Sequence, residues 1–154
     1  MILKLYSTIK KNNHNPNPNS MTSNFDKYVR FVNQVTSDES KDAVAFMNRI
    51  QDLKEQKTEM HRLLTGAVGV CSEGGEFLEI VKKMIFQGKP WDEANIHHLK
   101  IELGDIMWYV AQCCMALDVP LEEITDMNID KLSKRYPEGH FSEYYSENRK
   151  PGDL

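Results

Sequence analysis

Apolar residues recur at intervals of three and four over most of the chain, which is the spacing of one face of an α-helix. The first stripe predicts a helix that is capped by Ser23 or Asn24 and ends at Val35. After a polar break, Ser37 or Ser40 is expected to open a second helix. The positions expected to be buried in that second helix are Val44, Phe46, Met47, Ile50 and Leu53.

Two longer helices follow. The first is predicted from Thr58 to about Phe86, because Gly88 and Pro90 are residues that typically end a helix. Asp92 is the expected N-cap of the next helix. This helix is apolar nearly all round from Leu99 to Leu117, which predicts a central position among other helices.

The last predicted helix runs from Leu121 to about Arg135, and Pro137 and Gly139 end it. No segment shows the alternation of apolar and polar residues that is typical of a β-strand. We therefore expect an all-α fold, built as a bundle of four to five helices.

The two ends of the chain are polar. The Asn- and Pro-rich run KNNHNPNPNS cannot bury apolar area, so residues 1–23 are expected to form a disordered tail, and Met21 is a candidate for an alternative translation start. Residues 24–145 are expected to fold as one domain, and residues 146–154 to form a polar C-terminal tail. A length of 154 residues is sufficient for one such core.

Four glycines interrupt the helix predicted around residues 58–86: Gly66, Gly69, Gly74 and Gly75. Each costs about 1 kcal/mol relative to alanine inside a helix, so their presence needs a reason. One explanation is close helix packing, or a break near Gly74 and Gly75. The other explanation is free space for a metal ion and phosphate.

Charge and cysteine content narrow the function classes. The formal net charge of −4 argues against nucleic-acid binding through a basic surface. Cys71, Cys113 and Cys114 lie within apolar helical pattern and lack the spacing of a disulfide framework, which indicates reduced thiols and a cytoplasmic location. The segment MILKLYSTIKK is too short and polar for a signal peptide or a membrane span, so no membrane partner is expected.

Two pairs of acids stand within apolar helical pattern. Glu73 and Glu76 are three residues apart, as are Glu102 and Asp105, so each pair projects from one face of its helix. Burying unpaired carboxylates is costly, and a hard divalent cation with several oxygen ligands removes that cost. We expect the two pairs to face each other and to hold Mg²⁺.

The same segments resemble the MazG-like family of all-α nucleoside triphosphate pyrophosphohydrolases, in its short single-domain form. The resemblance covers about Phe25–Tyr136. The matching motifs are EGGE at Glu73–Glu76, ELGD at Glu102–Asp105, NIDKL at Asn128–Leu132 and RYP at Arg135–Pro137. Glu76–Glu79 also fits the first motif, so three glutamates compete for two places. The Asn-rich start has no counterpart in the family pattern.

The resemblance implies hydrolysis of (deoxy)nucleoside triphosphates to monophosphate and pyrophosphate, through attack of water on the α-phosphorus. Mg²⁺, with Mn²⁺ as a possible substitute, would be held by Glu73, Glu76, Glu102 and Asp105. Glu79 would be a fifth ligand or the base that orients water, and Glu76 is a second candidate for catalysis. Family members form dimers or dimers of dimers, so a homodimer or homotetramer is expected. The predicted phosphate contacts are Lys83, Asn128, Lys131, Arg135 and Tyr136.

Other interpretations stay open. A non-catalytic helical module for metal binding or protein interaction would leave the buried acids unexplained, and a di-iron bundle normally needs a Glu-x-x-His spacing that the sequence lacks. Trp108 and Tyr109 fit core positions better than base stacking, and Trp91 suits a cap on the bundle or a wall of the base pocket. His97 and His98 are expected at the surface. The preferred base and sugar do not follow from the sequence.

Overall fold

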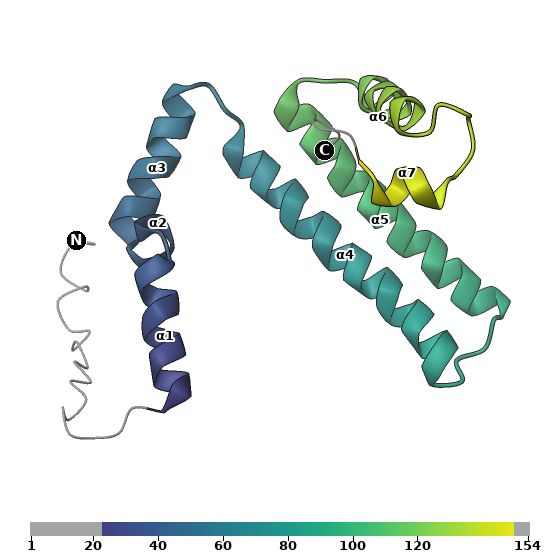
Figure 1. Ribbon diagram of the computed structural model, residues 1–154, viewed down its shortest axis with the longest axis horizontal. Coiled ribbons are helices and arrows are strands. Elements are labelled where there is room, and N and C mark those ends of the chain that lie inside the picture. Colours follow the sequence, from purple (N-terminus) through teal and green to yellow (C-terminus); the bar gives the residue numbers. More distant parts are fainter. Residues whose placement is uncertain (1–22, 150–154) are drawn as a thin grey trace. The chain divides into compact units, whose positions relative to one another are not determined.

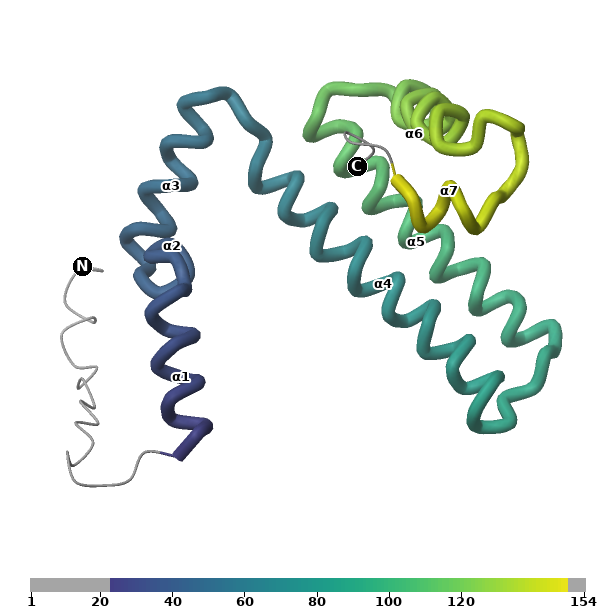
Figure 2. Tube along the Cα trace, in the orientation of Figure 1, coloured from purple at the N-terminus to yellow at the C-terminus, as the bar shows by residue number. Residues whose placement is uncertain are grey.

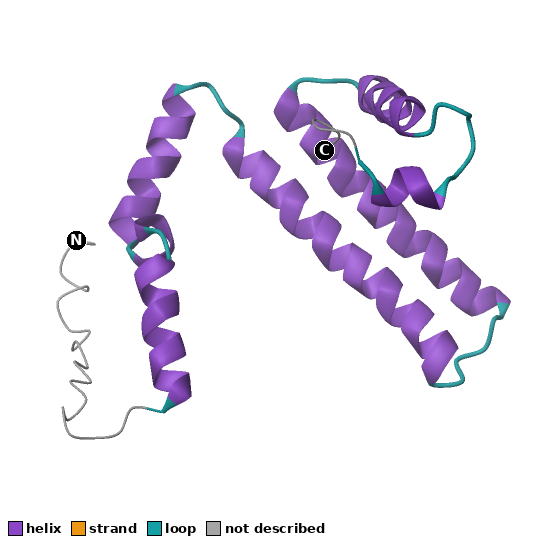
Figure 3. Cartoon of the chain, in the orientation of Figure 1, coloured by secondary structure: helices purple, strands orange, loops and turns teal. Residues whose placement is uncertain are grey.

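The computed structural model describes residues 23–149, and its regular structure there is entirely helical (Figure 3). The expected all-α class is therefore confirmed. Residues 1–22 of the predicted N-terminal tail and residues 150–154 of the predicted C-terminal tail lie outside the described part. The helices are α1 (Asn24–Val35), α2 (Asp38–Lys41), α3 (Ala43–Glu55), α4 (Met60–Phe86), α5 (Glu93–Leu117), α6 (Leu121–Arg135) and α7 (Glu143–Glu147).

The chain divides into two compact units, one ending at Met47 and the other beginning at Asn48. In the first unit, Ser23 caps α1 through a reciprocal pair of hydrogen bonds. The Ser23 hydroxyl accepts from the Asp26 backbone N–H at 3.1 Å, and the Asp26 carboxylate accepts from the Ser23 backbone N–H at 2.9 Å. Of the two predicted caps, Ser23 is thus the one used.

The second predicted helix is divided into α2 and α3. Asp42 between them has an extended backbone, and its carboxylate accepts hydrogen bonds from the backbone N–H groups of Val44 and Ala45 at 2.9 and 2.8 Å. Ser37 is the N-cap position of α2, as one of the two predicted starts. The expectation of one continuous helix from there was wrong, because Asp42 supplies a new cap that starts α3 at Ala43.

In the second unit, α4 and α5 lie side by side and run in opposite directions (Figures 1 and 2). Gly88, with a φ of 70°, stands in the connection after α4. The Asp92 carboxylate then caps α5 by accepting from the Asn95 N–H at 2.9 Å. These are the stop and start positions that the sequence predicted.

Two glycines allow α4 to approach α5 closely. A Cβ atom on Gly69 would collide with the Tyr109 ring, and one on Gly66 would meet Cys113 and lie 3.1 Å from the Tyr109 carbonyl oxygen. Close packing therefore explains these two glycines. Gly74 and Gly75 have open space around them, and the helix continues through both, so the predicted alternative of a break there is wrong.

Few side chains are enclosed by this pair of helices. Ile80 of α4 and Cys114 of α5 are buried, and Glu102 of α5 retains only 5% of its exposure. The far side of α5 is uncovered in the single chain, where exposed apolar side chains include Ile101, Leu103, Met107, Trp108 and Met115. Within residues 23–149, no helix is long and apolar enough to cross a membrane.

Beyond α5, Asp118 adopts a left-handed conformation that closes the helix, and α6 follows. The sequence predicted this helix. It did not predict α7, whose five residues, EYYSE, are too few to display a helical period.

Candidate metal centre between α4 and α5

The face that α4 turns towards α5 is defined by buried residues. Gly66 and Ile80 are buried, and Glu73 lies seven positions from each. Because a helix advances about 100° per residue, positions seven apart lie almost in line. Glu73 is therefore carried on the face that meets α5, and Glu76 follows one turn later on the side of that face.

On α5, Glu102 occupies the corresponding position. It lies seven residues before Tyr109, whose ring packs against Gly69 of α4. One carboxylate oxygen each from Glu73, Glu76 and Glu102 lie within 4.8 Å of one another. Asp105 is exposed one turn further along α5. The structure thus brings three of the four predicted ligands together.

The electrostatics of the cluster are unfavourable without a counter-ion. The pKa of Glu73 is raised, first by its partial removal from water and then by the negative charges of Glu76, Asp105 and Glu102. Asp105 is therefore close enough to act on the same carboxylate, although it lies outside the group of three. Accumulated negative charge of this kind favours a bound cation.

The donor set suits a hard divalent ion. Mg²⁺ binds oxygen ligands at about 2.0–2.1 Å, so two ligands of one ion lie at most about 4.2 Å apart. The oxygens of the three glutamates, all within 4.8 Å of each other, need only small side-chain rotations to reach that spacing. Carboxylates without thiol or imidazole ligands are the chemistry of Mg²⁺, Ca²⁺ or Mn²⁺ rather than Zn²⁺.

Glu79 lies elsewhere on α4. It directly precedes buried Ile80, so it points about 100° away from the α5-facing side. Its carboxylate contacts the ammonium groups of Lys82 and Lys83, the latter at 3.2 Å, and these hydrogen bonds lower its pKa. The structure does not bring Glu79 or Lys83 into the carboxylate cluster.

The residues predicted to contact phosphate from the C-terminal motifs lie on or after α6. Asn128 and Lys131 are exposed and have no polar partner within the described part of the chain. Arg135 and Tyr136 are half-buried at the end of α6, where the Tyr136 ring lies 5.9 Å from that of Phe141. The structure shows no contact of Asn128, Lys131 or Tyr136 with the three glutamates.

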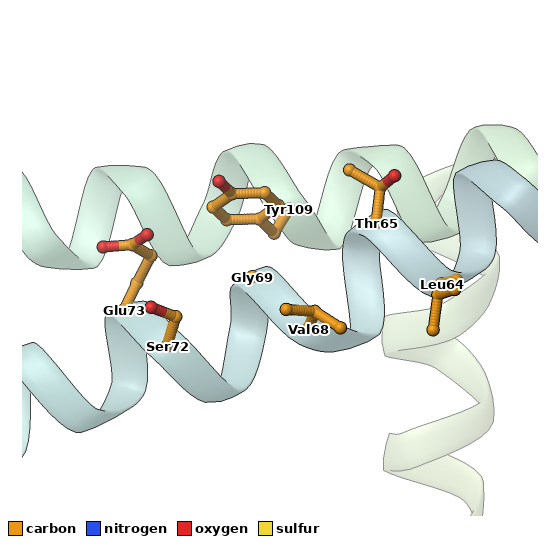
Figure 4. A pocket seen from close by; sticks show the side chains of 7 residues that line it. All are labelled: Leu64, Thr65, Val68, Gly69, Ser72, Glu73 and Tyr109. Atoms are coloured by element: carbon orange, nitrogen blue, oxygen red, sulfur yellow. The ribbon is translucent and has the colours of Figure 1, made fainter. Parts of the chain in front are cut away.

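A groove of about 400 Å³ adjoins the cluster and shares Glu73 with it. Figure 4 shows the Glu73 carboxylate at one end of the groove and Leu64 at the other, with Tyr109 of α5 between them. The groove has apolar walls and three side chains with a hydroxyl group. Its lining residues are Leu64, Thr65, Val68, Gly69, Ser72, Glu73 and Tyr109.

Two residues at this site were assigned other roles from the sequence. Tyr109 was expected in the core, yet it lines the groove. His98 was expected at the surface; it is half-exposed, but its Nε2 atom lies 2.8 Å from Oε1 of Glu102. The signal available for His98 was its position four residues before Glu102, which is one helical turn.

Comparison with known proteins agrees with the sequence motifs at Glu73–Glu76 and Glu102–Asp105. Residues 62–140, just over half of the chain, match the family model of the MazG nucleotide pyrophosphohydrolase domain. The Gene 37 protein of Mycobacterium phage L5 is 42% identical over 74 residues, which cover 47% of this chain and 64% of that protein, less than two thirds of its length. No solved structure matches the chain. The matched segment contains α5, α6 and nearly all of α4, and the chain belongs to the MazG nucleotide pyrophosphohydrolase family.

Proposed function

We propose that this chain hydrolyses nucleoside or deoxynucleoside triphosphates to the monophosphate and pyrophosphate, using Mg²⁺, through attack of water on the α-phosphorus. The observation that carries the proposal is the convergence of Glu73, Glu76 and Glu102 on one point between α4 and α5. Hydrolysis at a phosphate requires mainly positioning and neutralisation of oxygen charge, so a site that concentrates carboxylates for a cation suits it.

The residues of the cluster have distinct tasks in this proposal. Glu73 and Glu102 are the less exposed pair and would hold the ion, while Asp105 would contribute charge from the next turn of α5. A bound divalent ion would neutralise phosphate oxygens and act as a Lewis acid. Of the two acids predicted to act on water, Glu76 lies in the cluster and Glu79 is engaged by lysines. We therefore assign the orientation of water to Glu76.

The groove beside Glu73 is the proposed binding site of the nucleoside. Its volume of about 400 Å³ lies within the range of small-molecule sites, which are mostly apolar with a few polar groups. Thr65 and Ser72 offer hydroxyl groups to the sugar or base, and Tyr109 offers an aromatic ring and a hydroxyl. Because Glu73 belongs to both groove and cluster, a nucleoside lying there would present its phosphates to the carboxylates.

Other parts of the proposal rest on the sequence. The phosphate contacts of Asn128, Lys131, Arg135 and Tyr136 remain predictions that follow from the family resemblance. The cytoplasmic location also remains a prediction, and the three cysteines, which are free thiols in the structure, fit a reducing compartment.

The reaction is tested by incubating the full chain with the common ribo- and deoxyribonucleoside triphosphates and Mg²⁺, and by measuring pyrophosphate and monophosphate. We expect equal amounts of both products, no orthophosphate, and loss of turnover in Glu102→Gln and Asp105→Asn. The matched control is Glu122→Gln, an exposed acid on α6. Orthophosphate alone would indicate another cleavage position, and inertness towards every nucleotide would favour the non-catalytic module.

A further inference from the structure

The carboxylate with the least exposure in the cluster has a single polar contact. Within residues 23–149, the only polar contact of the Glu102 side chain is with His98, whose Nε2 lies 2.8 Å from Oε1. The Glu102 side chain is 7% exposed, whereas that of His98 is 51% exposed. His98 therefore links a nearly buried acid to the protein surface.

This contact restricts how Glu102 can turn. A glutamate side chain has three rotatable bonds, and a contact of 2.8 Å to one carboxylate oxygen limits the orientations that the group adopts. An ionised carboxylate accepts about four hydrogen bonds or metal contacts, so the bond from the His98 N–H leaves capacity for a cation. Hydrogen bonds from outer groups orient metal-binding carboxylates in this way in many metal sites.

We propose that His98 is a positioning residue, which holds the Glu102 carboxylate in the orientation that a divalent cation shared with Glu73 and Glu76 requires. The inference rests on the metal centre of the proposed function, but not on hydrolysis itself. A purely structural ion pair would behave differently, because its loss would lower the melting temperature of the metal-free chain and leave cation binding unchanged. Removal of His98 is thus expected to weaken cation binding while leaving the metal-free fold nearly unchanged.

The chain provides a matched control next to this residue. His97 is also on α5 and exposed, but it has no polar partner within the described part of the chain. Replacing His97 therefore makes the same chemical change at an adjacent position without touching Glu102. His98→Gln retains an N–H donor on a side chain long enough to reach four residues along a helix, so it serves as the conservative variant.

The experiment is titration of the full chain with Mn²⁺, in which free Mn²⁺ is followed by electron paramagnetic resonance. We expect the dissociation constant to rise about tenfold in His98→Ala, to be largely restored in His98→Gln, and to match wild type in His97→Ala. Melting temperatures without metal should agree for all four proteins. In a Glu102→Gln background, His98→Ala should cause no further loss.

Several results would overturn the proposal. The proposal fails if His98→Ala binds Mn²⁺ as tightly as wild type, or if His97→Ala loses as much Mn²⁺ affinity as His98→Ala. It also fails if His98→Gln does not recover affinity, or if His98→Ala still lowers affinity in the Glu102→Gln background. Absence of Mn²⁺ binding by the wild-type chain would overturn it as well. A chain that binds Mn²⁺ in the expected order but produces no pyrophosphate would contradict the proposed reaction and leave the role of His98 intact.

Discussion

At the scale of single residues, the acids clustered between α4 and α5 lower the stability of the folded chain when no cation is bound. The raised pKa of Glu73 means that the folded chain disfavours its ionised form, first through loss of water and then through neighbouring negative charge. Neutral pH lies well above the usual pKa range of a carboxyl group, so Glu73 is ionised in the unfolded chain. The folded chain disfavours this ionised form. Its charge therefore reduces stability when no cation is bound.

Replacing Glu73 by glutamine should consequently have opposite effects without and with metal. With chelator present, we expect a higher melting temperature than wild type, because one like charge is removed. With Mg²⁺ at about 100 times its dissociation constant, wild type should gain about 2.7 kcal/mol and the variant much less. Differential scanning calorimetry with EDTA or with Mg²⁺ measures both effects, and Glu122→Gln on α6 is the control. A lower melting temperature of Glu73→Gln in EDTA would contradict this account.

The residues of the site were partly predictable. Spacing within apolar helices identified Glu73, Glu76 and Glu102, because ionised side chains in such settings require a partner. Spacing alone did not separate Glu76 from Glu79, since all three glutamates of α4 are three residues apart. The distinction depends on which face of α4 meets α5, and that face is set by tertiary packing at Gly66, Gly69 and Ile80.

At the scale of the helices, the glycines of α4 fall into two groups with opposite expected behaviour. Gly69→Ala should destabilise the chain, because the new Cβ would overlap the Tyr109 ring and separate α4 from α5. Gly74→Ala and Gly75→Ala have open space and should each stabilise it by about 1 kcal/mol through helix propensity. Thermal or urea unfolding by circular dichroism, with chelator present, measures the difference.

The same alanine variants test the second explanation for these glycines. If the space beside Gly74 and Gly75 admits phosphate, both variants should lose turnover or raise KM while gaining stability. Stability gained without any kinetic change would limit the role of these glycines to the packing and propensity of α4.

The ends of a helix could be predicted from the sequence where a capping residue or a glycine marks them. Asp92 caps α5, and Gly88 follows α4, as their residue types predict. The division of α2 from α3 was missed, because the Asp42 carboxylate competes with continuation of the helix through bonds that the apolar period does not reveal. The register of α4 on α5 could not be predicted from the sequence either, since it depends on close packing at two glycines.

At the scale of the whole molecule, apolar side chains of α5 and α6 remain uncovered in the single chain. Trp108 and Met115 of α5 and Met127 and Ile129 of α6 are each more than half exposed. Such surface is unusual for a monomer and marks contact with another protein. We propose that it is covered by further copies of this chain in a homodimer or homotetramer.

Sedimentation velocity of the full chain at micromolar concentration should therefore give a mass of at least two chains. The melting temperature should also fall on dilution, because association stabilises the folded state by mass action. Sedimentation as a monomer with a melting temperature independent of concentration would contradict the proposed assembly. The family resemblance implied a homodimer or homotetramer, but the choice between two and four copies depends on surface shape that no helical period encodes.

The three clustered glutamates come from neighbouring helices of one hairpin, with Glu73 and Glu102 only 29 positions apart. Closing so short a loop restricts little chain entropy, and contacts between close segments form quickly during folding. We therefore expect the proposed ligands of the cation to come together early in folding, before distant parts of the polypeptide have packed.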